Sequence, residues 1–202
     1  MRQPAAERPV FTVIGGPNGA GKSTFTDALR RTRYALGEIV NPDVIAAALP
    51  GPDAARDARS GRETLRRTGA RIANGATFSR ETTLSSREIL RTMQAAKAAG
   101  FEVNLFFVGV DRLDTSQSRV RQRVAQGGHD IPPEAQARRF ERVFDNASRA
   151  AALADTTYFI HSGSNREFRL VGIARDGALV WRARPVGPRW FDRVAQDLTR
   201  TT

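Results

Sequence analysis

The stretch GGPNGAGKST, residues 15–24, decides the fold of this chain. It follows PVFTVI, residues 9–14, a short apolar run with β-branched residues that is typical of a buried parallel strand. Gly16 to Ser23 has the spacing G-x-x-x-x-G-K-[ST] of a P-loop, whose glycines let successive backbone N–H groups point into one anion-sized hollow. The strand, this loop and a following helix together predict a nucleoside triphosphate site.

Two side chains of the loop have defined tasks in such a site. We expect Lys22 to reach the β- and γ-phosphates and Ser23 to offer its hydroxyl to Mg²⁺. Lys22 and Lys97 are the only lysines among 32 basic residues, so a lysine kept in the loop indicates a need for a compact positive charge. ATP is the expected nucleotide, with GTP as the alternative. The expected ATP-binding residues are Gly16, Pro17, Asn18, Gly19, Ala20, Gly21, Lys22, Ser23 and Thr24.

Further strands and helices alternate along the chain. Apolar runs predict strands at 38–41, 77–80, 103–110 and 156–160, and a hairpin over 166–183 that turns at Asp176-Gly177. Helices are expected from about 21 and from 42, over 62–73, 86–99, 113–126 and 133–153, and from 189, with 51–61 as a loop. This order is typical of a P-loop NTPase-type α/β fold with a doubly wound, mainly parallel sheet and a C-terminal hairpin.

The composition is that of an ordinary enzyme of one domain. The chain has 202 residues, 40% of them hydrophobic and 26% charged, and we expect a single domain over 1–202. The absence of cysteine excludes disulfides and thiolate metal sites. No apolar run is long enough to cross a bilayer, and MRQPAAERPV lacks the apolar segment of a secretory signal, so we expect a cytoplasmic protein without a membrane partner.

The net charge of +11 indicates anionic ligands without identifying one. The arginines are scattered, as in REFRL, WRARP and LRRTGARIA, and few aromatic residues lie among them. A nucleic-acid groove would need a continuous basic surface with stacking aromatics, so nucleic acid is not the expected partner.

Carboxylates at the ends of predicted strands are the candidates for the acceptor side, because doubly wound folds bind ligands at that rim. Asp43 in NPDVIA is a candidate general base for an acceptor hydroxyl, and a structural role as helix N-cap or first-turn aspartate is an equal alternative. Glu81, beside Thr82 and Thr83, is expected to bind acceptor hydroxyls or a water on Mg²⁺, or else to cap the next helix. Asp111 resembles a Walker B aspartate and ranks below Glu81.

The two arginine-rich helices of residues 112–153 predict a lid over the phosphates. Arg119 and Arg123 share one helical face, and Arg139 flanks the apolar stripe of the second helix, so these three are candidates for phosphate contacts. Gly127-Gly128 and His129 lie in the connection between the helices. Arg138, Arg142 and Arg149 are expected to face solvent.

The motifs GGPNGAGKST, NPDVIA, FSRETTLS and RVRQRVAQGGHDIP, in this order from about Val10 to Asp155, resemble the zeta toxin family of P-loop kinases. The match is closest to its short chromosomal members, often described as predicted ATPases. The resemblance implies transfer of phosphate from ATP to a sugar hydroxyl of UDP-N-acetylglucosamine or a related UDP-aminosugar. It also implies a small antitoxin protein as a partner of some members.

The resemblance assigns roles residue by residue. It makes Lys22 the phosphate lysine and Asp43 the catalytic base, places Glu81 and Thr82 against the acceptor, and gives the arginines around Arg123 and Arg139 the phosphate clamp. The sequence departs from the family at His161-Ser162, where relatives tend to have Asp-Asn before the serine, so the adenine-side contacts are expected to differ.

Two other functions remain open from the residues alone. The same fold would serve a kinase of another small hydroxyl acceptor, such as a dinucleotide, a nucleotide or an antibiotic. A nucleic-acid-binding ATPase or a polynucleotide kinase would instead use the positive charge, and its binding would weaken steeply with salt.

Overall fold

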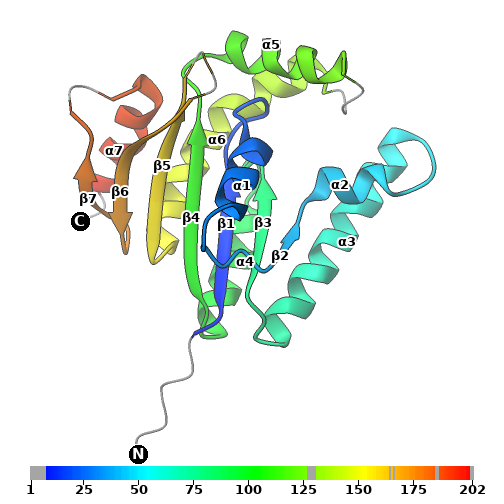
Figure 1. Cartoon of the computed structure of the whole chain (residues 1–202), viewed down its shortest axis with the longest axis horizontal. Helices are drawn as coiled ribbons and strands as arrows, with labels where there is room; N and C mark the ends of the chain where they lie inside the picture. Colours follow the sequence, from blue (N-terminus) through cyan, green and yellow to red (C-terminus); the bar gives the residue numbers. More distant parts are fainter. Residues whose placement is uncertain (1–7, 127–130, 164, 166, 185–186, 201–202) are drawn as a thin grey trace, which may run out of the picture.

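The computed structural model describes residues 8–126, 131–163, 165, 167–184 and 187–200. Within these ranges seven strands form one sheet in the order β2-β3-β1-β4-β5-β6-β7 (Figure 1). Neighbouring strands run parallel from β2 to β5, and β6 and β7 add antiparallel pairs at the edge. The strands are β1 (Val10–Gly15), β2 (Glu38–Val40), β3 (Phe78–Thr82), β4 (Glu102–Gly109), β5 (Thr156–Ser162), β6 (Phe168–Arg175) and β7 (Ala178–Arg182).

Helices cover both faces of the sheet. α1 (Lys22–Arg30) lies on one face, and α4 (Glu88–Ala98), α6 (Pro133–Leu153) and α7 (Arg189–Arg200) pack together on the other (Figure 1). α5 (Leu113–Val124) crosses above the carboxyl ends of the central strands, and α2 (Pro42–Ala47) and α3 (Asp53–Ala73) stand beside β2. None of the helices in the described ranges has the length and apolar character needed to cross a membrane.

Consecutive residues of β4 show how the two faces are packed. Phe106 points toward α1 and lies 5.6 Å from Phe25, ring centre to ring centre. Phe107 points to the opposite face and lies 5.9 Å from Phe144 of α6. Because successive strand side chains alternate between faces, a continuous apolar strand is stable only with helices on both sides. The prediction of a doubly wound, mainly parallel P-loop fold is therefore confirmed.

The C-terminal hairpin is also confirmed. Asp176 has φ 46° and Gly177 φ 79°, so both central residues of the turn between β6 and β7 are in the left-handed region. A two-residue hairpin turn of this kind matches the twist of its strands, and Asp-Gly is among its preferred sequences.

The prediction of a loop over 51–61 was wrong, because α3 already begins at Asp53. Alanine and arginine in this stretch are strong helix formers. The inner face of α3 is made by Ser60, Thr64 and Thr68, each 2% exposed or less. These buried residues are polar, so the apolar periodicity that marks a helix is missing from the sequence.

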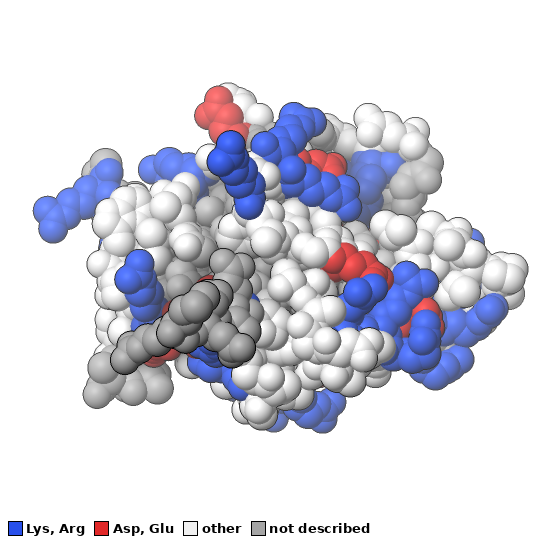
Figure 2. Space-filling model, turned by 60° about the horizontal axis from the view of Figure 1, so that its bottom comes forward, with Lys and Arg blue, Asp and Glu red and all other residues white. Residues whose placement is uncertain are grey.

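Basic side chains do not merge into one surface on the face shown in Figure 2. Lysine and arginine lie there in separate groups with uncharged surface between them. Several exposed arginines are paired with acids, for example Arg66 with Glu63 at 2.7 Å and Arg193 with Asp145 at 2.6 Å. The positive charge is therefore partly compensated by acids, and on the face in Figure 2 it is divided into separate patches.

Candidate functional site

The P-loop runs from the end of β1 to the start of α1. Gly21 is the N-cap of α1 with φ 90°, a conformation that favours glycine. Gly19 has φ 69°, and a Cβ there would lie 2.4 Å from the carbonyl oxygen of Ser116 in α5. The loop is therefore packed directly beneath α5, and Ser116 fixes this contact by donating its hydroxyl to the Asn18 carbonyl at 2.5 Å.

Lys22 lies inside the loop. Its Nζ donates to the carbonyl oxygens of Gly16 at 2.9 Å and Pro17 at 3.0 Å. Burial lowers the pKa of Lys22 to about 8, and the nearby charges of Glu81 and Asp43 partly offset this effect. The charge of Arg123 lowers the same pKa further. Lys22 therefore titrates just above neutral pH.

Glu81 connects the P-loop to two other elements. One carboxylate oxygen accepts from Ser23 Oγ and from Asn41 Nδ2, both at 2.9 Å, and the other accepts from Thr26 Oγ1 at 2.7 Å. The side chain is 6% exposed, so these three donors replace water around the carboxylate. Glu81 does not cap a helix, because α4 begins only at Glu88 and its N-cap, Arg87, makes no side-chain cap.

The contact between Ser23 and Glu81 fits a magnesium ion. Within the described ranges, no group of three or more His, Cys, Asp or Glu side chains could hold a metal by itself. Mg²⁺ needs no such group when it is held by one or two protein oxygens, several waters and substrate phosphates. The hydroxyl of Ser23 and the buried carboxylate of Glu81 are two protein oxygen ligands of the kind that Mg²⁺ uses.

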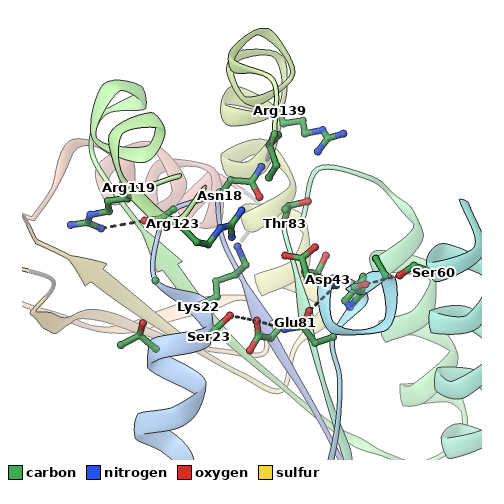
Figure 3. Close-up of a pocket in the computed structure, with 18 of the residues that line it drawn as sticks. Asn18, Lys22, Ser23, Asp43, Ser60, Glu81, Thr83, Arg119, Arg123 and Arg139 are labelled. Atoms are coloured by element: carbon green, nitrogen blue, oxygen red, sulfur yellow. Dashed lines mark hydrogen bonds between the residues drawn. The ribbon is translucent and has the colours of Figure 1, made fainter. Parts of the chain in front are cut away.

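Asp43 lies in the first turn of α2, which is one of the two structural positions expected for it, but it is not the cap. Asn41 takes that position, and its Oδ1 accepts from the Asp43 backbone N–H at 2.9 Å. The Asp43 carboxylate is thereby left for the cavity, into which it projects near Lys22 and Thr83 (Figure 3). Ser60 of α3 holds this helix in place by donating its hydroxyl to the Pro42 carbonyl at 2.6 Å.

One cavity of about 490 Å³ brings most of the sequence candidates together. Its floor is the P-loop, its acceptor side is formed by α2, α3 and the end of β3, and its roof by α5 and α6 (Figure 3). The sequence candidates among its lining residues are Asn18, Gly19, Gly21, Lys22, Ser23, Thr24, Asp43, Glu81, Thr82, Thr83, Arg119, Arg123 and Arg139.

The structure also shows which of the remaining residues named from the sequence do not line the cavity. Asp111 is exposed in a bend after β4 and does not line the cavity. Arg138, Arg142 and Arg149 are exposed and outside its lining, which confirms the expectation that they face solvent. His129, named as a lid residue, lies outside the described residues.

Arg119 joins three segments that are far apart in the chain. Its guanidinium donates to Ser162 Oγ at 2.8 Å, to the Gly163 carbonyl and to the Gly19 carbonyl at 3.4 Å. It therefore fastens α5 to the end of β5 and to the P-loop. The sequence predicted that Arg119 shares a helical face with Arg123 but did not predict these partners. The polar Ser162, just after a predicted strand, was the available signal.

Further lining residues were missed, and four of them show why. Phe168 comes from the start of β6, and Asp57, Ser60 and Gly61 come from the part of α3 that was assigned to a loop. The error in the secondary structure therefore concealed one wall of the cavity.

Comparisons with known proteins agree with this fold and loop. The profile of a family described as an AAA domain matches residues 11–147. An uncharacterized protein of Haemophilus influenzae is 32% identical over 117 residues, which cover 57% of this chain and 81% of the relative.

Two solved structures illustrate the likeness of the fold. The AvrRxo1-ORF1:-ORF2 complex with ATP has a TM-score of 0.67 and 18% identity, over 96% of this chain and 76% of that one. The PezAT chromosomal toxin–antitoxin system of Streptococcus pneumoniae has a TM-score of 0.61 and 17% identity, over 83% and 72% of the two chains.

Proposed function

The chain belongs to the AAA-domain family, and on that premise we propose that it is an ATP-dependent kinase that phosphorylates a sugar hydroxyl of UDP-N-acetylglucosamine or a related UDP-aminosugar. One observation carries the proposal. Lys22 and Asp43 line the same cavity, close enough for the Asp43 charge to raise the Lys22 pKa. A phosphate cradle and a free carboxylate facing one space suit phosphoryl transfer to a hydroxyl group.

The proposed reaction transfers the γ-phosphoryl group of ATP to the acceptor hydroxyl. The acceptor hydroxyl oxygen bonds to the γ-phosphorus of ATP while the bond from that phosphorus to the β–γ bridging oxygen breaks, and ADP leaves. The hydroxyl proton passes to the Asp43 carboxylate and then to solvent. Lys22 and Arg123, whose charges already act on each other, stabilise the negative charge on the transferring group.

Ser23 and Glu81 would hold Mg²⁺, Ser23 through its hydroxyl and Glu81 through a water or directly. When bound, the ion supplies positive charge to the β- and γ-phosphates. Thr26 and Asn41 keep the Glu81 carboxylate in position by their hydrogen bonds.

The cavity contains groups that can bind both parts of a nucleotide sugar, its sugar hydroxyls and its diphosphate. Asp43, Thr82 and Thr83 offer hydrogen-bonding groups to sugar hydroxyls, and the roof arginines Arg123 and Arg139 offer charge to a diphosphate. The sequence resemblance to zeta toxins points to the same acceptor. A toxin role with a small antitoxin partner is part of this proposal, and the toxin–antitoxin context of the similar PezAT fold supports it. A cytoplasmic location, where ATP and nucleotide sugars are available, is part of the same proposal.

A polynucleotide substrate fits the protein less well. A nucleic-acid groove joins basic side chains with stacking aromatic rings. On the face in Figure 2 the basic groups are separated by uncharged surface, and Phe168 is the only aromatic residue lining the described cavity. A cavity of about 490 Å³ suits a small molecule.

The experiment is a screen with γ-labelled ATP and Mg²⁺ against UDP-aminosugars, dinucleotides, nucleotides, aminoglycosides and an oligonucleotide. We expect label in the UDP-aminosugars with the wild-type protein and with Arg149→Ala, and none with Lys22→Ala. Label only in another class would disprove the acceptor and keep the kinase; label in none would disprove the kinase.

A further inference from the structure

Asp57 and Gly61 lie on one face of α3, because residues four apart on a helix are neighbours. Both line the acceptor side of the cavity, next to Pro42 and Ala46 of α2. Ser60 lies between them, but its hydroxyl is used by the Pro42 carbonyl. Asp57 forms no ion pair or hydrogen bond within the described part of the chain, so its carboxylate is open to a ligand.

Neither the backbone nor the packing requires glycine at position 61. Gly61 lies inside α3 and has no positive φ, and a Cβ there would meet no atom within 4 Å. Glycine inside a helix costs about 1 kcal/mol relative to alanine. Gly61 is exposed and lines the cavity, so a Cβ there would stand in open space at the cavity wall.

Gly69 of the same helix provides an internal comparison. Its Cβ would also meet no atom within 4 Å, and its φ is also ordinary, but it does not line the cavity. The presence of a glycine in α3 therefore does not by itself indicate a ligand-binding position. What distinguishes Gly61 is its position beside the Asp57 carboxylate in the wall of the cavity.

We propose that Gly61 and Asp57 form the wall that selects the acceptor: the missing side chain of Gly61 leaves room for a neutral, hydroxyl- or amide-bearing part of the acceptor against α3, and Asp57 accepts its hydrogen bonds. This inference rests on the proposed kinase function and deepens it. In this binding mode the neutral end of the acceptor contacts α3, and the hydroxyl that is phosphorylated lies next to Asp43.

The charges of the cavity fix the direction of the acceptor. Asp43 and Asp57 make the α2–α3 side negative, and Arg123 and Arg139 make the roof positive. An anionic group against α3 would face two carboxylates, so the anionic part of the acceptor belongs under the arginines. A sugar-like group therefore belongs next to Gly61.

The test compares Gly61→Leu with Gly69→Leu, because leucine is a good helix former and the two sites differ mainly in whether they line the cavity. The acceptor is the compound that the γ-labelling screen identifies. For Gly61→Leu we expect the acceptor KM to rise at least about tenfold and the Kd for ATP to stay within about twofold of wild type. For Gly69→Leu we expect neither constant to change.

Asp57→Asn supplies a second variant that keeps the shape of the side chain. We expect it to raise the acceptor KM about threefold to tenfold, with kcat reduced less than in Asp43→Asn. Thermal unfolding checks that Gly61→Leu and Gly69→Leu are both at least as stable as wild type, since each replaces a helical glycine.

The possible results separate this inference from the function on which it rests. The role of Gly61 and Asp57 in acceptor selection is wrong if Gly61→Leu leaves the acceptor KM unchanged. It is also wrong if Gly61→Leu and Gly69→Leu raise that KM equally. Neither result would contradict the kinase activity. Labelling of an acceptor that is not a UDP-aminosugar overturns the proposed substrate, and the same two variants then test the wall on that acceptor. A wild-type protein that labels no compound overturns both.

Discussion

Ser23 of the P-loop donates its hydroxyl to Glu81 at 2.9 Å, across the edge where β1 and β3 end side by side. The same carboxylate holds Thr26 and the N-cap residue Asn41. One buried charge thus couples the nucleotide loop to the helix that carries Asp43. Because three donors surround it, Glu81 is positioned before any ligand binds.

Glu81→Gln should weaken the response to magnesium. The amide loses the charge and presents N–H groups where Ser23, Thr26 and Asn41 donate, so both the ion and the hydrogen-bond network are affected. We expect the Mg²⁺ concentration for half-maximal turnover to rise at least about tenfold. The matched control is Glu102→Gln, at the start of β4, which should behave as wild type. Unchanged magnesium dependence would show that Glu81 has a structural role only.

Lys22 should take up a proton when ATP binds above neutral pH. Its pKa is about 8 in the free protein, and the phosphates of ATP should raise it because they favour the charged form. At pH 8.5 we expect uptake of about 0.7 proton per ATP, falling to about 0.1 at pH 7. Affinity should therefore fall as the pH rises through the free-protein pKa. Calorimetry in buffers of different ionisation enthalpy measures the uptake, and Lys22→Arg should abolish it.

Asp43→Asn should separate binding from transfer. The amide keeps the size of the side chain and the Asn41 cap, because that cap uses the backbone N–H of residue 43. We expect an unchanged Kd for ATP and a single-turnover rate at least about a hundredfold lower, since the amide cannot accept the hydroxyl proton. Asp27→Asn, in an exposed pair with Arg30, is the control. Near-normal transfer would exclude Asp43 as the base.

The roof arginines should differ from their neighbours. Arg123 and Arg139 line the cavity, whereas Arg142 and Arg149 do not. Each of Arg123→Ala and Arg139→Ala should lower turnover at least about tenfold, the effect of one lost charge-assisted contact. Arg142→Ala and Arg149→Ala should stay within about twofold of wild type. Equal losses in all four variants would contradict the placement of the phosphates under the roof.

The sequence predicted the features that local patterns encode. The P-loop needs only neighbouring residues, and the carboxylates Asp43 and Glu81 could be placed because each follows a recognisable strand. The partners of Glu81 could not be predicted, since Ser23 and Asn41 lie 58 and 40 residues away in the chain. The wall with Asp57 and Gly61 was missed because the buried face of α3 is polar, so no apolar period marks the start of the helix.

Mass spectrometry of UDP-N-acetylglucosamine incubated with the protein, ATP and Mg²⁺ is the most direct test of the proposed reaction. We expect the sugar nucleotide to gain the mass of one phosphate group while an equal amount of ADP appears. With Asp43→Asn we expect this gain to be at least about a hundredfold slower, under conditions where that variant binds ATP as tightly as wild type. No gain with any of several UDP-aminosugars, together with phosphorylation of a dinucleotide or an oligonucleotide, would contradict the proposed acceptor.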